Sequence, residues 1–157
     1  MTPAIKLAQK KKIPYTIHEY IHDPKVTSYG LEAAEKIGVD PACVFKTLVV
    51  TLDGQQLAVG VVPVEGMLNM KRMAKAAGAK KAAMAEKTAV ERATGYILGG
   101  VSPLAQKKRL ATVIDASAQK FPTIFVSGGR RGLDIELSPK DLQQLVSAVF
   151  AEISDPS

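Results

Sequence analysis

The sequence predicts an α+β fold in which a strongly curved, barrel-like mixed sheet, mainly antiparallel, is surrounded by short helices. Runs of β-branched residues are interspersed with short helical patterns, without the strict strand–helix alternation of a parallel sheet. Two such runs flank Asp53-Gly54, which predicts an antiparallel hairpin over residues 44–64. The length of 157 residues suits one domain, which we expect to span residues 1–157.

The elements before the hairpin are bounded by residues with clear conformational preferences. A helix over residues 2–11 begins with a threonine and a proline that suit its cap and first position. Residues 15–21 are rich in β-formers and predict a strand. A cap at Thr27 or Ser28 and a stop at Gly38 predict a helix over residues 28–38.

After the hairpin, Asn69 caps a helix that runs to about Ala77 and ends at Gly78. A second short helix is predicted over residues 86–95. Further strands are predicted over residues 111–117, 123–129 and 133–138.

The last helix is predicted to begin at Ser138-Pro139 and to continue to about Glu152. Its core face would carry apolar residues at helical spacing, namely Leu142, Leu145, Val146, Val149 and Ile153. The final residues 154–157 are expected to form a frayed tail.

Composition limits the classes of protein to be considered. A formal net charge of +6 attracts polyanions such as nucleic acid, although a lysine-rich solvated surface would have the same charge. The single cysteine, Cys43, excludes an internal disulfide and suits a reducing compartment. We expect no signal peptide, no membrane span and a cytoplasmic location. Glycine motifs for dinucleotides or P-loop nucleotides are absent from the sequence.

Residues 18–22 match the zinc-protease pattern H-E-x-x-H, which requires two histidines on one turn of a helix. The context favours a strand instead, because prolines flank the segment and β-formers fill it. On a strand His18, Tyr20 and His22 would share one face. We therefore expect no metal, and Tyr20 becomes a candidate for the wall of a pocket.

Lys46 lies among aliphatic residues of the first hairpin strand. It is either a side chain that extends to solvent near a strand end, or an ammonium that binds an anionic or carbonyl group at a pocket mouth. Thr47 faces the opposite side and would reach the same pocket only near a strand end or a twist.

Two glycine-rich loops follow predicted helices and strands. In residues 95–108, Gly99-Gly100 permits close approach of a ligand to backbone N–H groups, which suit a developing oxyanion. The alternative is a simple turn between two elements. Residues 127–132 form a second loop of the same kind, also after a β run.

Four stretches together resemble the YbaK family of Cys-tRNA(Pro) deacylases across nearly the whole chain. They are MTPAIKLAQKKKIPYTIHEYIHDP, VFKTLVV, GYILGGVSPLAQKKR and VSGGRRGLDIELSP. The resemblance implies a curved mixed sheet with surrounding helices, no cofactor, and hydrolysis of cysteine wrongly attached to the proline tRNA. The wider superfamily includes the editing domain of bacterial prolyl-tRNA synthetase, which implies that synthetase as a partner.

The resemblance implies that Lys46 is the signature lysine and that Gly99 and Gly100 form the carbonyl-binding loop. It assigns further pocket-lining positions to Tyr20, Tyr29, Thr47, Ser127 and Asp134. Tyr29 stands where relatives commonly have phenylalanine, and Ala105 where many have glycine.

In family terms the substrate brings its own nucleophile, because the cysteinyl thiol ionises readily and attacks its own ester. The protein would hold the attack geometry and stabilise the oxyanion. Two alternatives are a deacylase of another small mischarged tRNA, such as Ala-tRNA(Pro), and a non-enzymatic tRNA or small-ligand binding module. Candidate contacts to the tRNA backbone are Lys71, Arg72, Lys80, Lys81, Lys107, Lys108 and Arg130.

Overall fold

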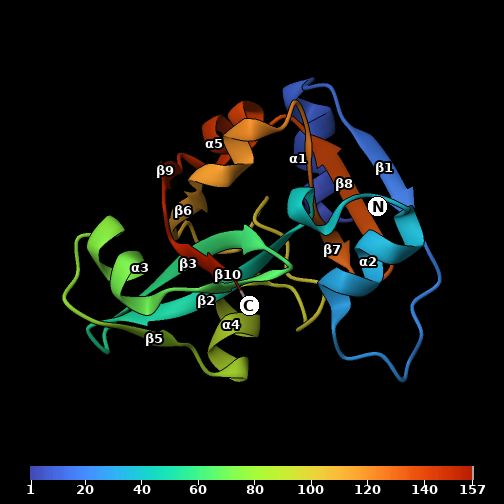
Figure 1. Ribbon diagram of the computed structural model, residues 1–157. Helices are drawn as coiled ribbons and strands as arrows, with labels where there is room; N and C mark the ends of the chain where they lie inside the picture. Colours follow the sequence, from blue (N-terminus) through green and yellow to red (C-terminus); the bar gives the residue numbers. More distant parts are fainter. Residues whose placement is uncertain (157) are drawn as a thin grey trace.

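The computed structural model describes residues 1–156 and has the mixed α+β architecture that the sequence predicts (Figure 1). The largest sheet has the order β5 (Ala82–Met84), β2 (Phe45–Leu52), β3 (Gln56–Pro63), β6 (Ala111–Asp115) and β9 (Val149–Ala151). A second sheet joins β1 (Thr16–Glu19), β8 (Leu133–Leu137) and β7 (Ile124–Arg130). A small third sheet pairs β10 (Ser154–Pro156) with β4 (Gly66–Leu68).

The predicted mixture of strand directions is confirmed. The β3–β6 and β6–β9 pairs are parallel, and the other strand pairs among residues 1–156 are antiparallel. The two larger sheets meet at one parallel bridge between Val44 and Phe125. Within the described residues the sheets do not close on themselves, so the barrel-like part of the prediction is not confirmed.

Except for the end of the last helix, the helices begin and end near the predicted residues. They are α1 (Pro3–Lys11), α2 (Tyr29–Ile37), α3 (Met70–Ala76), α4 (Lys87–Thr94) and α5 (Pro139–Val146), with the 3₁₀ segments η1 (Pro41–Cys43) and η2 (Ala116–Lys120). The cap of α3 is typical, since Asn69 Oδ1 accepts the Arg72 N–H at 2.9 Å. None of these helices is both long and apolar enough to span a bilayer, as judged over residues 1–156.

The predicted hairpin is present as β2 and β3, paired from Phe45 opposite Pro63 to Leu52 opposite Gln56. Asp53 and Gly54 both have positive φ, at 53° and 67°, which turns the chain with the twist of the strands. The hairpin and the second sheet enclose the main core, which includes Val49, Val59, Ile114, Val126 and Ile135. Lys46 therefore lies close to where the two sheets meet.

The prediction for the C-terminal segment is wrong beyond Val146. Ser147 adopts the left-handed region with φ of 54°, and the Ala148 N–H then closes the helix end on the Gln143 carbonyl at 2.9 Å. Val149 lies in β9 and is 53% exposed, so it is not on a core helix face. Residues 154–156 form β10 rather than a frayed tail, because β4 offers them a pairing edge.

Ala105 also adopts the left-handed region, with φ of 55°. A Cβ atom in that region costs about 1–2 kcal/mol, whereas glycine adopts it without steric cost. We expect Ala105→Gly to raise the free energy of unfolding by about 0.5–1 kcal/mol, after the entropy that glycine gains in the unfolded chain is subtracted. Urea denaturation measures this change, and a variant less stable than wild type would contradict it.

Candidate active site

A cavity of about 580 Å³ lies where the start of β2 meets the second sheet, α2 and the 97–101 segment. Its volume falls within the range of small-ligand sites. Of the eight predicted catalytic and substrate-binding residues, seven line it: Tyr20, Tyr29, Lys46, Thr47, Gly99, Ser127 and Asp134. The structure therefore brings the 97–101 segment, the predicted 127–132 segment and the strand lysine to one cavity. The prediction of a loop over 127–132 is wrong for residues 127–130, which lie in β7 with a register shift before Arg130, and only residues 131–132 form a turn.

Lys46 and Thr47 both face this cavity although they are neighbours on one strand. They lie near the first residue of β2, where β3 pairs with one edge of the strand and β5 on the other edge pairs only with residues 50–52. Burial lowers the pKa of the Lys46 ammonium, and no ion pair to it occurs within residues 1–156. Thr47 Oγ1 is buried and has no hydrogen-bond partner among the described residues. Lys46 is thus available to a ligand in the cavity, whereas Thr47 Oγ1, unpaired within residues 1–156, is a polar atom buried beside it.

Asp134 supplies a buried carboxyl to the same cavity. It stands directly opposite Ser127 in the β7–β8 pair, which puts the two side chains on one face of the sheet. Asp134 is 6% exposed, and burial raises the pKa of its carboxyl to about 7. Burial and the nearby Asp134 charge raise the pKa of Tyr20 to about 12, so the phenol stays neutral. A buried acid of this kind favours a cationic ligand group.

The 97–100 segment forms a tight turn. The Gly100 N–H donates to the Ile97 carbonyl at 2.9 Å, and Gly99 has φ of 88°, as in the third residue of a type II turn. The Gly100 N–H, which the sequence offered as a second donor to a substrate, is therefore occupied within the turn. This residue is buried outside the cavity lining, and a Cβ there would lie 2.7 Å from Arg130 Cα. Gly100 lets the 97–100 turn pack against Arg130 at the end of β7, and Gly99 remains the candidate donor.

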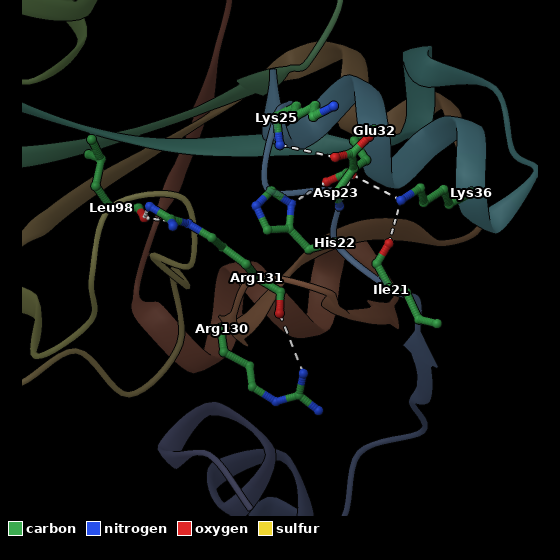
Figure 2. A network of polar contacts seen from close by, with 9 residues as sticks. All are labelled: Ile21, His22, Asp23, Lys25, Glu32, Lys36, Leu98, Arg130 and Arg131. Atoms are coloured by element: carbon green, nitrogen blue, oxygen red, sulfur yellow. Dashed lines mark hydrogen bonds and ion pairs between the residues drawn. The ribbon is translucent and has the colours of Figure 1, made fainter. Parts of the chain in front are cut away.

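A buried glutamate organises the segment that forms one edge of the cavity (Figure 2). Glu32 of α2 lies 2.7 Å from His22 Nδ1, accepts the Asp23 N–H at 2.8 Å, and lies 3.1 Å from Lys36 Nζ. Burial alone would raise the pKa of Glu32, but these hydrogen bonds lower it to about 2. Residues 20–28, which include cavity-lining Tyr20, are thereby held against the helix.

The two histidines of the H-E-x-x-H pattern serve different carboxylates. His18 lies on strand β1 with Nε2 2.8 Å from Glu136 Oε1, whereas His22 contacts Glu32. Within residues 1–156, no three side chains of the ligand types His, Cys, Asp and Glu gather to hold a metal ion. The pattern therefore has a local structural role in the described chain.

Cys43 lies outside the cavity lining and is 9% exposed, with its Sγ donating to the Asp40 carbonyl at 3.0 Å. Burial, and then the Asp40 charge, raise the pKa of its thiol, which disfavours the thiolate. We expect Cys43→Ser to retain the wild-type rate of any reaction in the cavity. A loss of more than about tenfold in a folded variant, measured under single-turnover conditions, would contradict this.

The sequence did not indicate part of the cavity wall. Met84 and Ala85 of the β5 region and Lys87 and Val90 of α4 reach the cavity because β5 pairs with β2. Of the predicted tRNA contacts, Arg130 lines the cavity, and its guanidinium pairs with Glu19 at 2.9 Å. The others are exposed and do not line the cavity: Lys71, Arg72, Lys80, Lys81, Lys107 and Lys108.

Similarity to known proteins indicates the family to which this chain belongs. A family model described as the aminoacyl-tRNA editing domain matches residues 23–145. EbsC of Enterococcus faecalis, named as a proposed Cys-tRNA(Pro)/Cys-tRNA(Cys) deacylase, is 37% identical over 153 residues, which cover 98% of this chain and 93% of that protein. The chain belongs to the aminoacyl-tRNA editing domain family. The resemblance inferred from the sequence is confirmed at the level of the family.

Solved structures share the architecture of this editing domain. The crystal structure of hypothetical protein APE2540 superimposes with a TM-score of 0.86 at 27% identity, covering 98% of this chain and 100% of that one. A protein described as a proposed trans-editing enzyme for prolyl-tRNA synthetase gives a TM-score of 0.81 at 21% identity, covering 99% of both chains. The second likeness shows the fold alone.

Proposed function

We propose that this editing domain is a trans-acting deacylase that hydrolyses the aminoacyl ester of Cys-tRNA(Pro). The observation that carries the proposal is the cavity, which combines the Lys46 ammonium, the buried Asp134 carboxyl and the Gly99 turn. Neither charged group has an ion-pair partner within residues 1–156. The name of the Enterococcus faecalis relative supports the choice of substrate.

The two charged groups suit the two ends of an aminoacyl-tRNA terminus. The Asp134 carboxylate binds the α-ammonium of the cysteinyl group, which compensates for the burial of that charge. Lys46 attracts the 3′-terminal nucleotide or the charge that develops on the ester. Tyr20, Tyr29, Thr47 and Ser127 form the walls around the amino acid.

The thiol of the bound cysteine then attacks its own ester carbonyl. A carbon–sulfur bond forms, the bond to the tRNA ribose oxygen breaks, and the thiol proton passes to that leaving oxygen. The Gly99 N–H stabilises the oxyanion during the attack. The product is a strained four-membered thiolactone, which water hydrolyses to free cysteine. No protein nucleophile is needed, since the site supplies geometry and charge.

The basic surface supports binding of the tRNA backbone without sequence readout. The exposed cations and the net charge of +6 favour phosphate contacts, and affinity would fall steeply with salt. Prolyl-tRNA synthetase is the proposed source of the mischarged tRNA, and the cytoplasm is the proposed compartment.

The test is a deacylation assay with the proline tRNA charged with cysteine, alanine or serine. The proposal predicts rapid release of cysteine and slow release of alanine and serine, and alkylation of the cysteinyl thiol abolishes release. Equal hydrolysis of the alanyl ester would contradict the thiol-assisted route and favour an activated water. Retained tRNA binding without hydrolysis of any ester would contradict the enzymatic function.

A further inference from the structure

Arg131 contacts a backbone carbonyl and an aromatic ring rather than a carboxylate. Its guanidinium donates two hydrogen bonds to the Leu98 carbonyl, from Nε at 3.1 Å and from Nη2 at 2.7 Å (Figure 2). Its Cζ lies 4.6 Å from the centroid of the Tyr29 ring. No carboxylate lies within ion-pair distance of it in the part of the chain that the structure describes.

The two hydrogen bonds from Arg131 restrain the turn because they hold the Leu98 carbonyl. The Leu98–Gly99 peptide is the central peptide of the 97–100 turn. In a planar trans peptide the N–H points opposite to the carbonyl. Because Arg131 holds the Leu98 carbonyl, the Gly99 N–H points away from Arg131. Leu98 and Gly99 line the cavity, whereas Arg131 does not.

The packing around the turn leaves little freedom. A Cβ atom on Gly99 would lie 2.5 Å from Arg131 Nε and 3.0 Å from the Tyr29 ring. Tyr29 in turn has its ring centroid 5.6 Å from that of His22, which lies 2.7 Å from buried Glu32. The guanidinium thus connects the turn to the start of α2, which lines the same cavity.

We propose that Arg131 is a positioning residue for the deacylation reaction, in which it fixes the Leu98–Gly99 peptide so that the Gly99 N–H faces the scissile ester. This rests on the proposed function. It differs from a phosphate-binding role, for which any cation near the cavity would serve. Positioning requires the planar fork of arginine, with two donors to one carbonyl and a flat face on the tyrosine.

The test compares Arg131→Lys and Arg131→Gln with wild type in single-turnover deacylation of Cys-tRNA(Pro). We expect the maximal rate to fall about 10- to 100-fold in both variants, with substrate affinity and its salt dependence nearly unchanged. The matched control is Arg92→Gln, which removes an exposed arginine of α4 and is expected to leave the rate unchanged. Full activity in Arg131→Lys, or a loss confined to affinity and salt dependence, would overturn the proposal.

A second readout does not depend on catalysis. Amide hydrogen exchange at Gly100 reports its bond to the Ile97 carbonyl, and we expect faster exchange in both Arg131 variants. If wild type does not deacylate any ester while Gly100 loses protection in the variants, the proposed function fails and the fixing of the turn by Arg131 stands. If wild type is active and neither rate nor exchange changes in the variants, the role of Arg131 fails alone.

Discussion

Gly99→Ala is expected to lower the single-turnover rate of deacylation by about 10²- to 10³-fold, the range seen when an oxyanion donor is lost. Gly99 has φ of 88°, so a side chain there strains the backbone. The new Cβ would also lie 2.5 Å from Arg131 Nε and 3.0 Å from the Tyr29 ring. The turn must shift, and the N–H that we assign to the oxyanion shifts with it.

The control for backbone strain is Gly38→Ala. Gly38 has φ of 82°, and a Cβ added there would have no heavy atom within 4 Å, so the substitution introduces the conformational cost without a collision. We expect Gly38→Ala to lose about 1 kcal/mol of stability and to retain activity. A folded Gly99→Ala variant with the wild-type rate would show that the Gly99 N–H does not take part in the reaction.

Asp134→Asn is expected to lower the deacylation activity by about 10²-fold or more. The same substitution is expected to stabilise the protein at neutral and higher pH. The pKa of the Asp134 carboxyl in the folded wild-type protein is about 7, above the ordinary value of 3.8. Such a group contributes stability that is complete below pH 3.8 and is lost as pH rises to about 7. The total loss in the free energy of unfolding is on the order of 4 kcal/mol. The Asp134→Asn variant would recover part of it at about pH 8.

Denaturation of both proteins between about pH 4 and pH 8 would measure this effect, and kcat/KM over the same range gives a second test. For wild type, kcat/KM should fall below about pH 7 as Asp134 takes up a proton and no longer attracts the α-ammonium. Asp134→Asn should lack this pH dependence. A variant less stable than wild type at the upper end of this range, or one with full activity, would contradict the assignment.

Glu136→Gln is the matched control for Asp134. Glu136 follows Asp134 on the same face of β8, outside the cavity lining, and accepts a hydrogen bond from Thr123 Oγ1 at 2.6 Å. Hydrogen bonds from Thr123 and His18 lower the pKa of Glu136, so its ionised form stabilises the fold. We expect Glu136→Gln to destabilise the protein near neutral pH and to leave the deacylation rate unchanged.

The sequence predicted the elements whose signals are local. The caps at Thr2, Asn69 and Ser138 and the Asp53-Gly54 turn depend on residues within a few positions, and the structure has them. The strands β4, β9 and β10 have only three residues each, and they exist because distant segments offer pairing edges. No short-range pattern distinguishes such a strand from a helix end or a tail.

The candidate site was predictable in part. Lys46 and Gly99 stand out in the sequence as a lysine among aliphatics and a glycine before a second glycine. The burial of Asp134 depends on the packing of two sheets, and the reach of Arg131 to Leu98 crosses 33 positions of sequence. The hydrogen bond that occupies the Gly100 N–H depends on the turn type, which the sequence left open.

The most direct test of the central claim, that this cavity cleaves the aminoacyl ester, is the single-turnover rate of Cys-tRNA(Pro) hydrolysis by Lys46→Ala. Lys6→Ala is the matched control, because it removes an exposed lysine of α1 away from the cavity. The account predicts a rate at least about tenfold below wild type for Lys46→Ala and an unchanged rate for Lys6→Ala. Hydrolysis at the full wild-type rate by folded Lys46→Ala would contradict it.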